Sequence, residues 1–185
     1  MSQYSVCVFC GSRMGSDPAF EQAAIALGRA LARADMRLVY GAGDIGLMGA
    51  VANGAQAAGG QTFGVIPVHL LALERGKRDL TQFIVTENMH ERKKVMFMNA
   101  DALVTLPGGA GSLDELFEVL TWRQLGLHNK PIYLLDINGF WQPLLELIDH
   151  FIAQGFAGQS FRESLIVVDN IPALIAGLEA SRRAG

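Results

Sequence analysis

The sequence contains few of the residues that form metal and redox sites. Two of its 185 residues are cysteines and four are histidines. Cys7 and Cys10 have the spacing of a C-x-x-C motif, but Cys7 falls inside an expected strand, where residues three apart point to opposite faces. His69, His128 and His150 are scattered without the spacing of metal ligands. We therefore expect buried, unreactive thiols and no metal site.

Long runs of positive charge and long apolar runs are also missing. The net charge is −3, and the basic residues cluster no further than Arg92-Lys93-Lys94, so no nucleic-acid partner is expected. No apolar run approaches the roughly 20 residues that a membrane helix needs. The stretch Tyr4–Phe9 is too short for the apolar region of a signal peptide. These absences predict a cytoplasmic protein without a membrane partner.

What the sequence does contain is enough apolar residues for a sizeable core. Half of the chain is hydrophobic, and its length suits one domain spanning residues 1–185. Short apolar segments predict strands at residues 4–9, 37–40, 61–66, 82–86, 102–106, 131–135 and 165–168. Helical patterns follow most of them, and residues 68–80 are expected to form a loop or broken helix over one sheet edge. Alternating strands and helices of this kind predict a doubly wound, Rossmann-like parallel sheet with helices on both faces.

Three glycine-rich loops follow strands, and ligands of such sheets bind at the carboxyl ends of the strands. The first loop contains Gly11 and Ser12. The second, Gly41 to Gly49, matches the dinucleotide fingerprint through Gly41, Gly43 and Gly46. The next strand offers no Asp or Glu for a ribose, so NAD is not expected. A nucleotide-facing turn and tight helix–strand packing both remain open for this loop.

The third loop joins a strand to a helix through Pro107-Gly-Gly-Ala-Gly111. Unpaired N–H groups and the positive end of a helix dipole favour a bound anion there. No Gly-Lys-Ser/Thr follows, so this is not an ATP-hydrolysing Walker loop. Two interpretations stay open. Ser112 and Glu115 could form a capping box, or Gly109, Gly111 and Ser112 could hold a phosphate with Glu115 placed to act on the sugar.

An arginine in the helix predicted over residues 88–99 is unusual for its position. Met89, Arg92, Met96 and Asn99 recur at helical spacing, so Arg92 should point inward. An inward arginine needs an anion, which could be a buried carboxylate or a substrate group. Asn88 is placed to cap the start of this helix.

Together these residues resemble a known family. Pro107-Gly-Gly-Ala-Gly-Ser-Leu-Asp-Glu115 is similar to the P-G-G-x-G-T-x-x-E motif of the Lonely Guy (LOG) family, and Met89-His-Glu-Arg-Lys93 is similar to its second signature. Family members are cytokinin riboside 5′-monophosphate phosphoribohydrolases, once mislabelled lysine decarboxylases. Two departures stand out: Ser112 replaces a threonine and keeps its hydroxyl, and Ala42 replaces a glycine of the second loop.

The resemblance implies a reaction and a set of site residues. It implies hydrolysis of the N-glycosidic bond of an adenosine-type 5′-monophosphate, as in an AMP nucleosidase, with Arg92 and Glu115 as catalytic residues. It further implies that substrate is bound by the following residues: Glu74, Arg92, Lys93, Gly108, Gly109, Ala110, Gly111, Ser112, Leu113, Asp114, Glu115 and Thr121. Gly11, Ser12, Gly41, Gly43 and Met89 are further possible nucleotide contacts.

The resemblance also suggests a homodimer, with residues 116–122 as one possible contact, and no cofactor is expected. A non-catalytic nucleotide- or cofactor-binding carrier on the same fold is the alternative, because fold and phosphate loop do not imply chemistry. Lysine decarboxylation is disfavoured because Lys77, Lys93, Lys94 and Lys130 offer no evident site for a pyridoxal-phosphate Schiff base.

Overall fold

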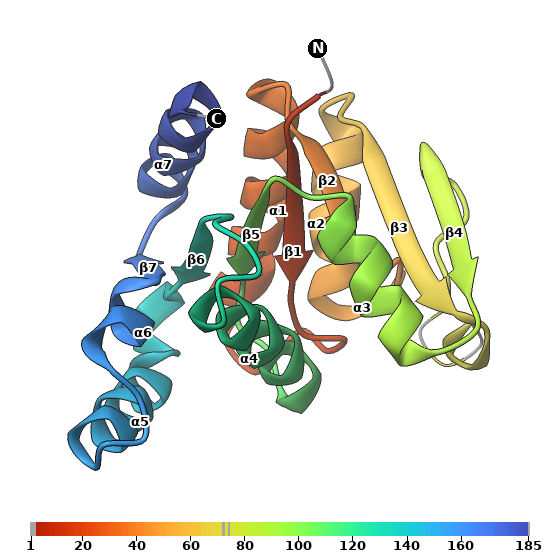
Figure 1. Cartoon of the computed structure of the whole chain (residues 1–185). Helices are drawn as coiled ribbons and strands as arrows, with labels where there is room; N and C mark the ends of the chain where they lie inside the picture. Colours follow the sequence, from red (N-terminus) through yellow and green to blue (C-terminus); the bar gives the residue numbers. More distant parts are fainter. Residues whose placement is uncertain (1–2, 72, 74, 185) are drawn as a thin grey trace.

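The computed structural model describes residues 3–71, 73 and 75–184, and within them the chain forms one parallel sheet of seven strands (Figure 1). The strands are β1 (Ser5–Phe9), β2 (Arg37–Tyr40), β3 (Thr62–Pro67), β4 (Gln82–Thr86), β5 (Ala102–Thr105), β6 (Ile132–Leu135) and β7 (Leu165–Val168). The helices are α1 (Pro18–Arg33), α2 (Gly46–Ala57), α3 (Met89–Met98), α4 (Ala110–Gln124), α5 (Gln142–Ala153), α6 (Gln159–Glu163) and α7 (Ile171–Ala184), with short 3₁₀ turns η1 (Val68–Leu70) and η2 (Ile137–Gly139). The predicted doubly wound α/β fold is confirmed.

The order of the strands determines where a ligand can bind. The sheet runs β4-β3-β2-β1-β5-β6-β7, so the chain winds outward from β1 to β4, returns through α3 to the centre, and winds the other way from β5 to β7. Strand order reverses between β1 and β5. The loops after these two strands diverge, and the crevice that opens between them is the usual ligand site of open parallel sheets.

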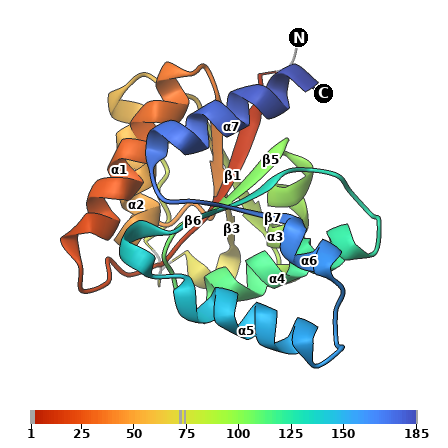
Figure 2. The same ribbon diagram turned by 90° about the vertical axis from the view of Figure 1, so that its left-hand side faces the viewer.

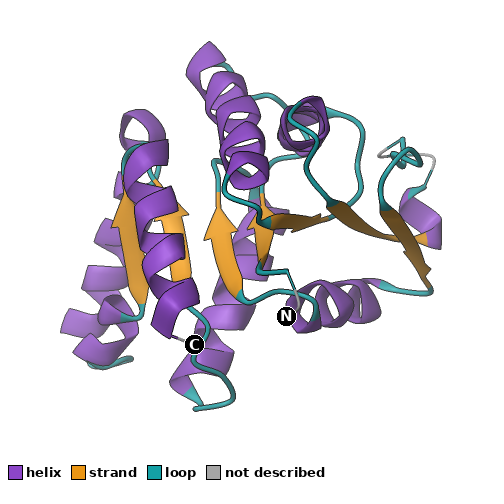
Figure 3. Ribbon diagram, turned by 90° about the horizontal axis from the view of Figure 1, so that it is seen from above, coloured by secondary structure: helices purple, strands orange, loops and turns teal. Residues whose placement is uncertain are grey.

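Helices cover both faces of the sheet (Figures 2 and 3). One core cluster contains side chains of α1, α2 and α7, and the other contains side chains of α3, α4, α5 and α6. Cys7 belongs to one cluster and Cys10 to the other, and both thiols are buried and free of a disulfide. Burial raises the pKa of Cys7 well above its ordinary value. The prediction that the two cysteines face opposite sides of the sheet is therefore confirmed.

Side chains cap two of the helices, one of them at the predicted Asn88. The Asp17 carboxylate accepts a hydrogen bond from the Ala19 N–H at 2.8 Å, and Pro18 occupies the first helical position of α1. The Asn88 side chain accepts from the Glu91 N–H at 2.9 Å at the start of α3. β3 extends one residue beyond the predicted strand of residues 61–66, to Pro67. Pro67 is the last residue of the strand and pairs in register with β4.

The irregular segment after β3 turns back onto the loop that follows β2. Gly76 forms an antiparallel bridge with Gly43, and the Lys77 N–H donates to the Ala42 carbonyl at 2.8 Å. The Lys77 ammonium forms an ion pair with Asp44 at 3.2 Å. This segment therefore fixes the second glycine loop from outside the sheet.

Among the described helices, none is both long enough and apolar enough to cross a membrane.

Candidate functional site

A cavity of about 490 Å³ lies at the carboxyl edge of the sheet, beyond the ends of the paired strands β1 and β5. The loop after β1, the turn before α4, and the first residues of α2 and α3 line it. The two central loops contact each other beneath it, because the Gly11 N–H donates to the Pro107 carbonyl at 3.1 Å. The cavity thus occupies the crevice that the strand order creates.

The turn that begins at Pro107 presents backbone N–H groups to this cavity. Helix α4 begins at Ala110 with Gly109 as its N-cap, so the N–H groups of its first turn have no carbonyl partner in the helix. Ser112 is the third helical residue and is buried at 4% exposure, so it is not the N-cap and the capping-box interpretation is wrong. A helix of 15 residues that begins in this way directs its positive end at the cavity.

Packing constrains one of the three glycines of this turn and leaves the other two unconstrained. A Cβ on Gly108 would collide with the Ser112 hydroxyl, so packing requires glycine there. A Cβ on Gly109 or Gly111 would meet no described atom within 4 Å. Packing does not require glycine at these two positions, and their open side faces the space in which an anion could approach the backbone.

Arg92 lies inward from α3, as predicted, with 4% of its surface exposed. Its Nε donates to the Val65 carbonyl at 3.2 Å, and one terminal nitrogen donates to the Gly41 carbonyl at 2.8 Å. A Cβ on Gly41 would collide with the guanidinium, so the second glycine loop makes room for this arginine. The backbone carbonyls after β2 and within β3 therefore hold Arg92 at the cavity wall.

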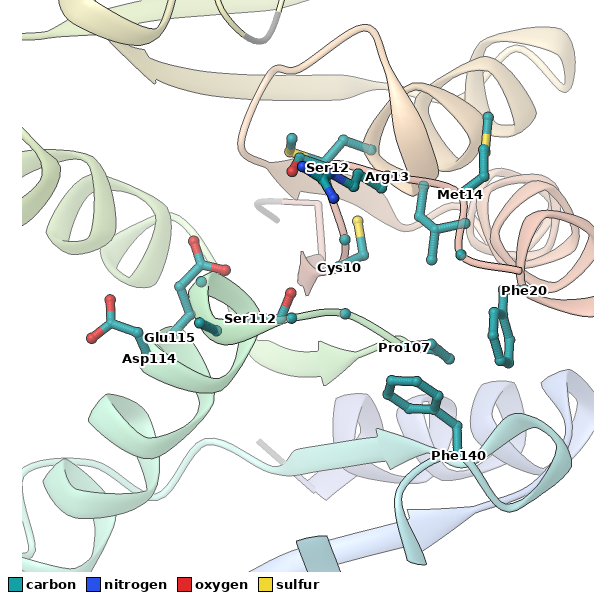
Figure 4. Close-up of a pocket in the computed structure, with 18 of the residues that line it drawn as sticks. Cys10, Ser12, Arg13, Met14, Phe20, Pro107, Ser112, Asp114, Glu115 and Phe140 are labelled. Carbon is teal, nitrogen blue, oxygen red and sulfur yellow. The ribbon is translucent and has the colours of Figure 1, made fainter. Parts of the chain in front are cut away.

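Glu115 lies one helical turn beyond the start of α4 and lines the same cavity, together with Asp114 (Figure 4). Arg92 comes from α3, and Asp114 and Glu115 come from α4, so two helices on the same face of the sheet supply one cation and two carboxylates. The structure thus brings together the glycine turn, Arg92 and Glu115 that the sequence singled out. Gly11, Ser12 and Met89 also line the cavity.

Five other residues expected at the site are not among those that line the described cavity. The Lys93 ammonium is 3.0 Å from Asp114 and 3.2 Å from Glu118. Burial alone would lower the pKa of Lys93, but these two carboxylates outweigh it and raise the pKa. Lys93, Leu113, Thr121, Gly41 and Gly43 do not line the described cavity, and Glu74 lies outside the described residues. Substrate contacts by these six residues, like those by the residues that line the cavity, stay a prediction.

Some cavity residues were not expected from the sequence. Phe20 in α1 and Phe140 after η2 are far apart in the chain, yet their ring centroids are 5.3 Å apart and both rings line the cavity. Arg13 and Met14, from the loop after β1, lie nearby (Figure 4). Their proximity depends on the meeting of two loops, so no local pattern indicated them.

A parallel α/β sheet with a glycine turn, a buried arginine and a carboxylate at its switch point defines a binding protein or enzyme for small anionic ligands.

Comparisons with known proteins identify the family. Residues 48–178 match a protein family described as "Possible lysine decarboxylase". A cytokinin riboside 5′-monophosphate phosphoribohydrolase of Rhodococcoides fascians is 45% identical over 177 residues, which are 95% of this chain and 89% of that protein.

A probable cytokinin riboside 5′-monophosphate phosphoribohydrolase of Oryza sativa is 42% identical over 94% of this chain and 76% of that protein. The chain therefore belongs to the LOG family of cytokinin riboside 5′-monophosphate phosphoribohydrolases. Among solved structures, the molybdenum cofactor carrier protein of Chlamydomonas reinhardtii superposes with a TM-score of 0.74 at 20% identity, covering 98% of this chain and 99% of that one. At that identity the likeness shows a shared fold alone.

Proposed function

We propose that the protein hydrolyses the N-glycosidic bond of adenosine 5′-monophosphates, including N6-substituted ones, to the free base and ribose 5-phosphate. The observation that carries the proposal is that Arg92 and Glu115 line one cavity with the free N-terminus of α4. The names of the relatives, which are 41–45% identical over most of this chain, support the same reaction.

Substrate binding in this proposal begins with the phosphate. The N–H groups at Gly109–Ser112 and the α4 dipole bind the 5′-phosphate, and the Ser112 hydroxyl adds a further donor. Glu115 is one turn further along the helix, so the sugar of a nucleotide anchored at the turn extends toward its carboxylate. The 5′-phosphate is remote from the bond that breaks, so its binding serves to orient the reacting carbon C1′.

Bond cleavage builds positive charge on the sugar and negative charge on the leaving base. Glu115 takes a proton from the attacking water and stabilises the cationic sugar, while the water oxygen bonds to C1′. The C1′–N9 electron pair leaves with the base, which takes up a proton from solvent, and Glu115 returns its proton to solvent. Arg92 stabilises the charge that develops on the base. It acts electrostatically, because a guanidinium is a poor proton donor at neutral pH.

The direct test is release of adenine from AMP by the purified protein, measured by chromatography. A Glu115→Gln variant should lose about 100-fold or more in turnover, because its amide cannot accept the water proton, yet still bind AMP. Glu146→Gln, an exposed position on α5, is the matched control and should behave as wild type. Near-normal turnover by Glu115→Gln would refute the assignment.

Two other activities are less well supported. The described residues that line the cavity include no lysine, so a Schiff-base site for lysine decarboxylation does not fit. A carrier without catalysis would share the fold and the phosphate turn but would not need Glu115. Free adenine in the AMP assay separates an enzyme from a carrier.

We further propose that the protein is a homodimer located in the cytoplasm, where nucleotide substrates are available. Met98, Leu125 and Leu127 are each more than 60% exposed, and a groove beside them is lined by Phe97 and Trp122. These apolar side chains of α3, α4 and the following loop suit a contact between copies. Of the expected contact region, Leu116 and Leu120 are buried within the chain's own core. Light scattering should give the molar mass of a dimer for the wild-type protein. The Met98→Lys variant should dissociate into monomers more readily.

A further inference from the structure

The cavity extends past the glycine turn, away from Glu115. Figure 4 shows Glu115 and Asp114 on one side of Ser112, with Phe20 and Phe140 on the other side, beyond Pro107. All of these residues line one cavity. The turn at which the phosphate is proposed to bind therefore lies between an acidic end and an aromatic end.

The direction of the substrate follows from the proposed function, on which this inference rests. With the 5′-phosphate at the N-terminus of α4 and C1′ next to Glu115, the sugar extends from the turn toward the acidic end. The base lies further still in that direction. A nucleoside monophosphate therefore leaves the aromatic end unfilled.

The side chains at the aromatic end suit a charged group followed by a flat ring. Phe140 is 38% exposed and Met14 is 40% exposed, so apolar surface faces the cavity. The Arg13 side chain is exposed, and it forms no hydrogen bond or ion pair with another residue in the described part of the chain. A guanidinium binds phosphate well, and aromatic faces stack on nucleobases.

We propose that the aromatic end is a second subsite, and that the protein binds dinucleotides in which two nucleosides are joined through a 5′,5″-diphosphate bridge. The first phosphate binds at the α4 turn, Arg13 binds the second phosphate, and the second base packs against Phe20 and Phe140. The glycosidic bond of the first nucleoside keeps its place beside Glu115.

The test compares the binding of diadenosine 5′,5″-diphosphate with that of AMP by calorimetry, in the Glu115→Gln variant so that neither ligand is consumed. The dinucleotide should bind about tenfold more tightly than AMP, since one stacked base contributes about 1–3 kcal/mol. Arg13→Gln and Phe140→Ala should each reduce this preference about tenfold. Phe156→Ala, at a side chain that is 84% exposed and does not line the cavity, should leave the preference unchanged.

Two results would overturn the second subsite: a dinucleotide that binds no more tightly than AMP, or a preference that survives both Arg13→Gln and Phe140→Ala. Arg13→Gln keeps the experiment informative if Phe140→Ala does not fold, because the Arg13 side chain is exposed and forms no hydrogen bond or ion pair with the other described residues. The adenine-release assay on the wild-type protein is a separate readout. Release of adenine without a dinucleotide preference overturns the subsite alone, and a dinucleotide preference without release of adenine overturns the proposed reaction.

Discussion

Replacing Gly111 with alanine should stabilise the protein and impair its activity at the same time. Gly111 is the second residue of α4, and a Cβ there would meet no described atom within 4 Å. Alanine is favoured over glycine inside a helix by about 0.8–1.0 kcal/mol, and 1 kcal/mol corresponds to about 2–4 °C in Tm for a chain of this size. Gly111→Ala should therefore raise Tm by about 2–4 °C, measured by differential scanning fluorimetry.

The same methyl group should obstruct the phosphate. It occupies the open space next to N–H groups that have no partner within α4. Loss of one hydrogen bond to a charged group costs about 1.5–3 kcal/mol, which corresponds to about a 10- to 100-fold increase in KM for AMP. Initial rates of adenine release at increasing AMP concentration give this value.

Gly158→Ala is the matched control. Gly158 is the N-cap of α6, has a negative φ of −90°, and would place its Cβ no nearer than 3.7 Å to another atom. This variant should leave KM unchanged. If Gly111→Ala raises Tm without changing KM, the phosphate does not approach Gly111. If Tm falls, the space beside Gly111 is not open as described.

Two further predictions concern stability. His128 Nδ1 accepts from the Lys130 N–H at 3.1 Å, its Nε2 lies 2.9 Å from the Val119 carbonyl, and burial, with Arg123 and Lys130 nearby, lowers its pKa below 6.5. Because a lowered histidine pKa favours the neutral form in the folded state, the stability it contributes is full above pH 6.5 and is lost as pH falls from 6.5 through the folded pKa. Tm measured from pH 8 to 5 should show a decline that is reduced in His128→Gln, and an equal decline in both proteins would contradict this assignment. Gly28→Ala should lower the free energy of unfolding by about 2–3 kcal/mol, because the added Cβ would collide with the Val51 carbonyl on the neighbouring helix. Urea unfolding measures this loss. An unchanged midpoint would show that α1 and α2 can separate freely.

The fold could be predicted because its elements are signalled locally. Every strand of the sheet is a short apolar run, and the central ones are buried on both faces, as expected for a parallel sheet. Asp17 and Asn88 mark helix starts through their own side chains, so their positions are readable in one stretch of sequence. The short helix α6 was not predicted, because five residues are too few to show a helical period.

The start of α4 shows where local reasoning fails. Ser112 is a good N-cap residue, and the sequence therefore allowed a helix that begins after it. The helix instead begins at Ala110, and Gly109 occupies the cap position without any side chain. Capping by a side chain is therefore absent at the point where the phosphate is proposed to bind, and the first-turn N–H groups stay available to a ligand.

Arg92 and Lys93 show why adjacency in sequence does not establish a shared site. Both are buried, but successive residues of a helix point about 100° apart, so the two cations leave α3 in different directions. Arg92 reaches the carbonyls of Gly41 and Val65 at the cavity wall, whereas Lys93 reaches Asp114 on α4. Asp114 precedes Glu115, so the Lys93 ion pair joins the helix that bears the arginine to the helix that bears the carboxylate. Lys93 thus links α3 to α4 through an ion pair, although it does not line the described cavity itself.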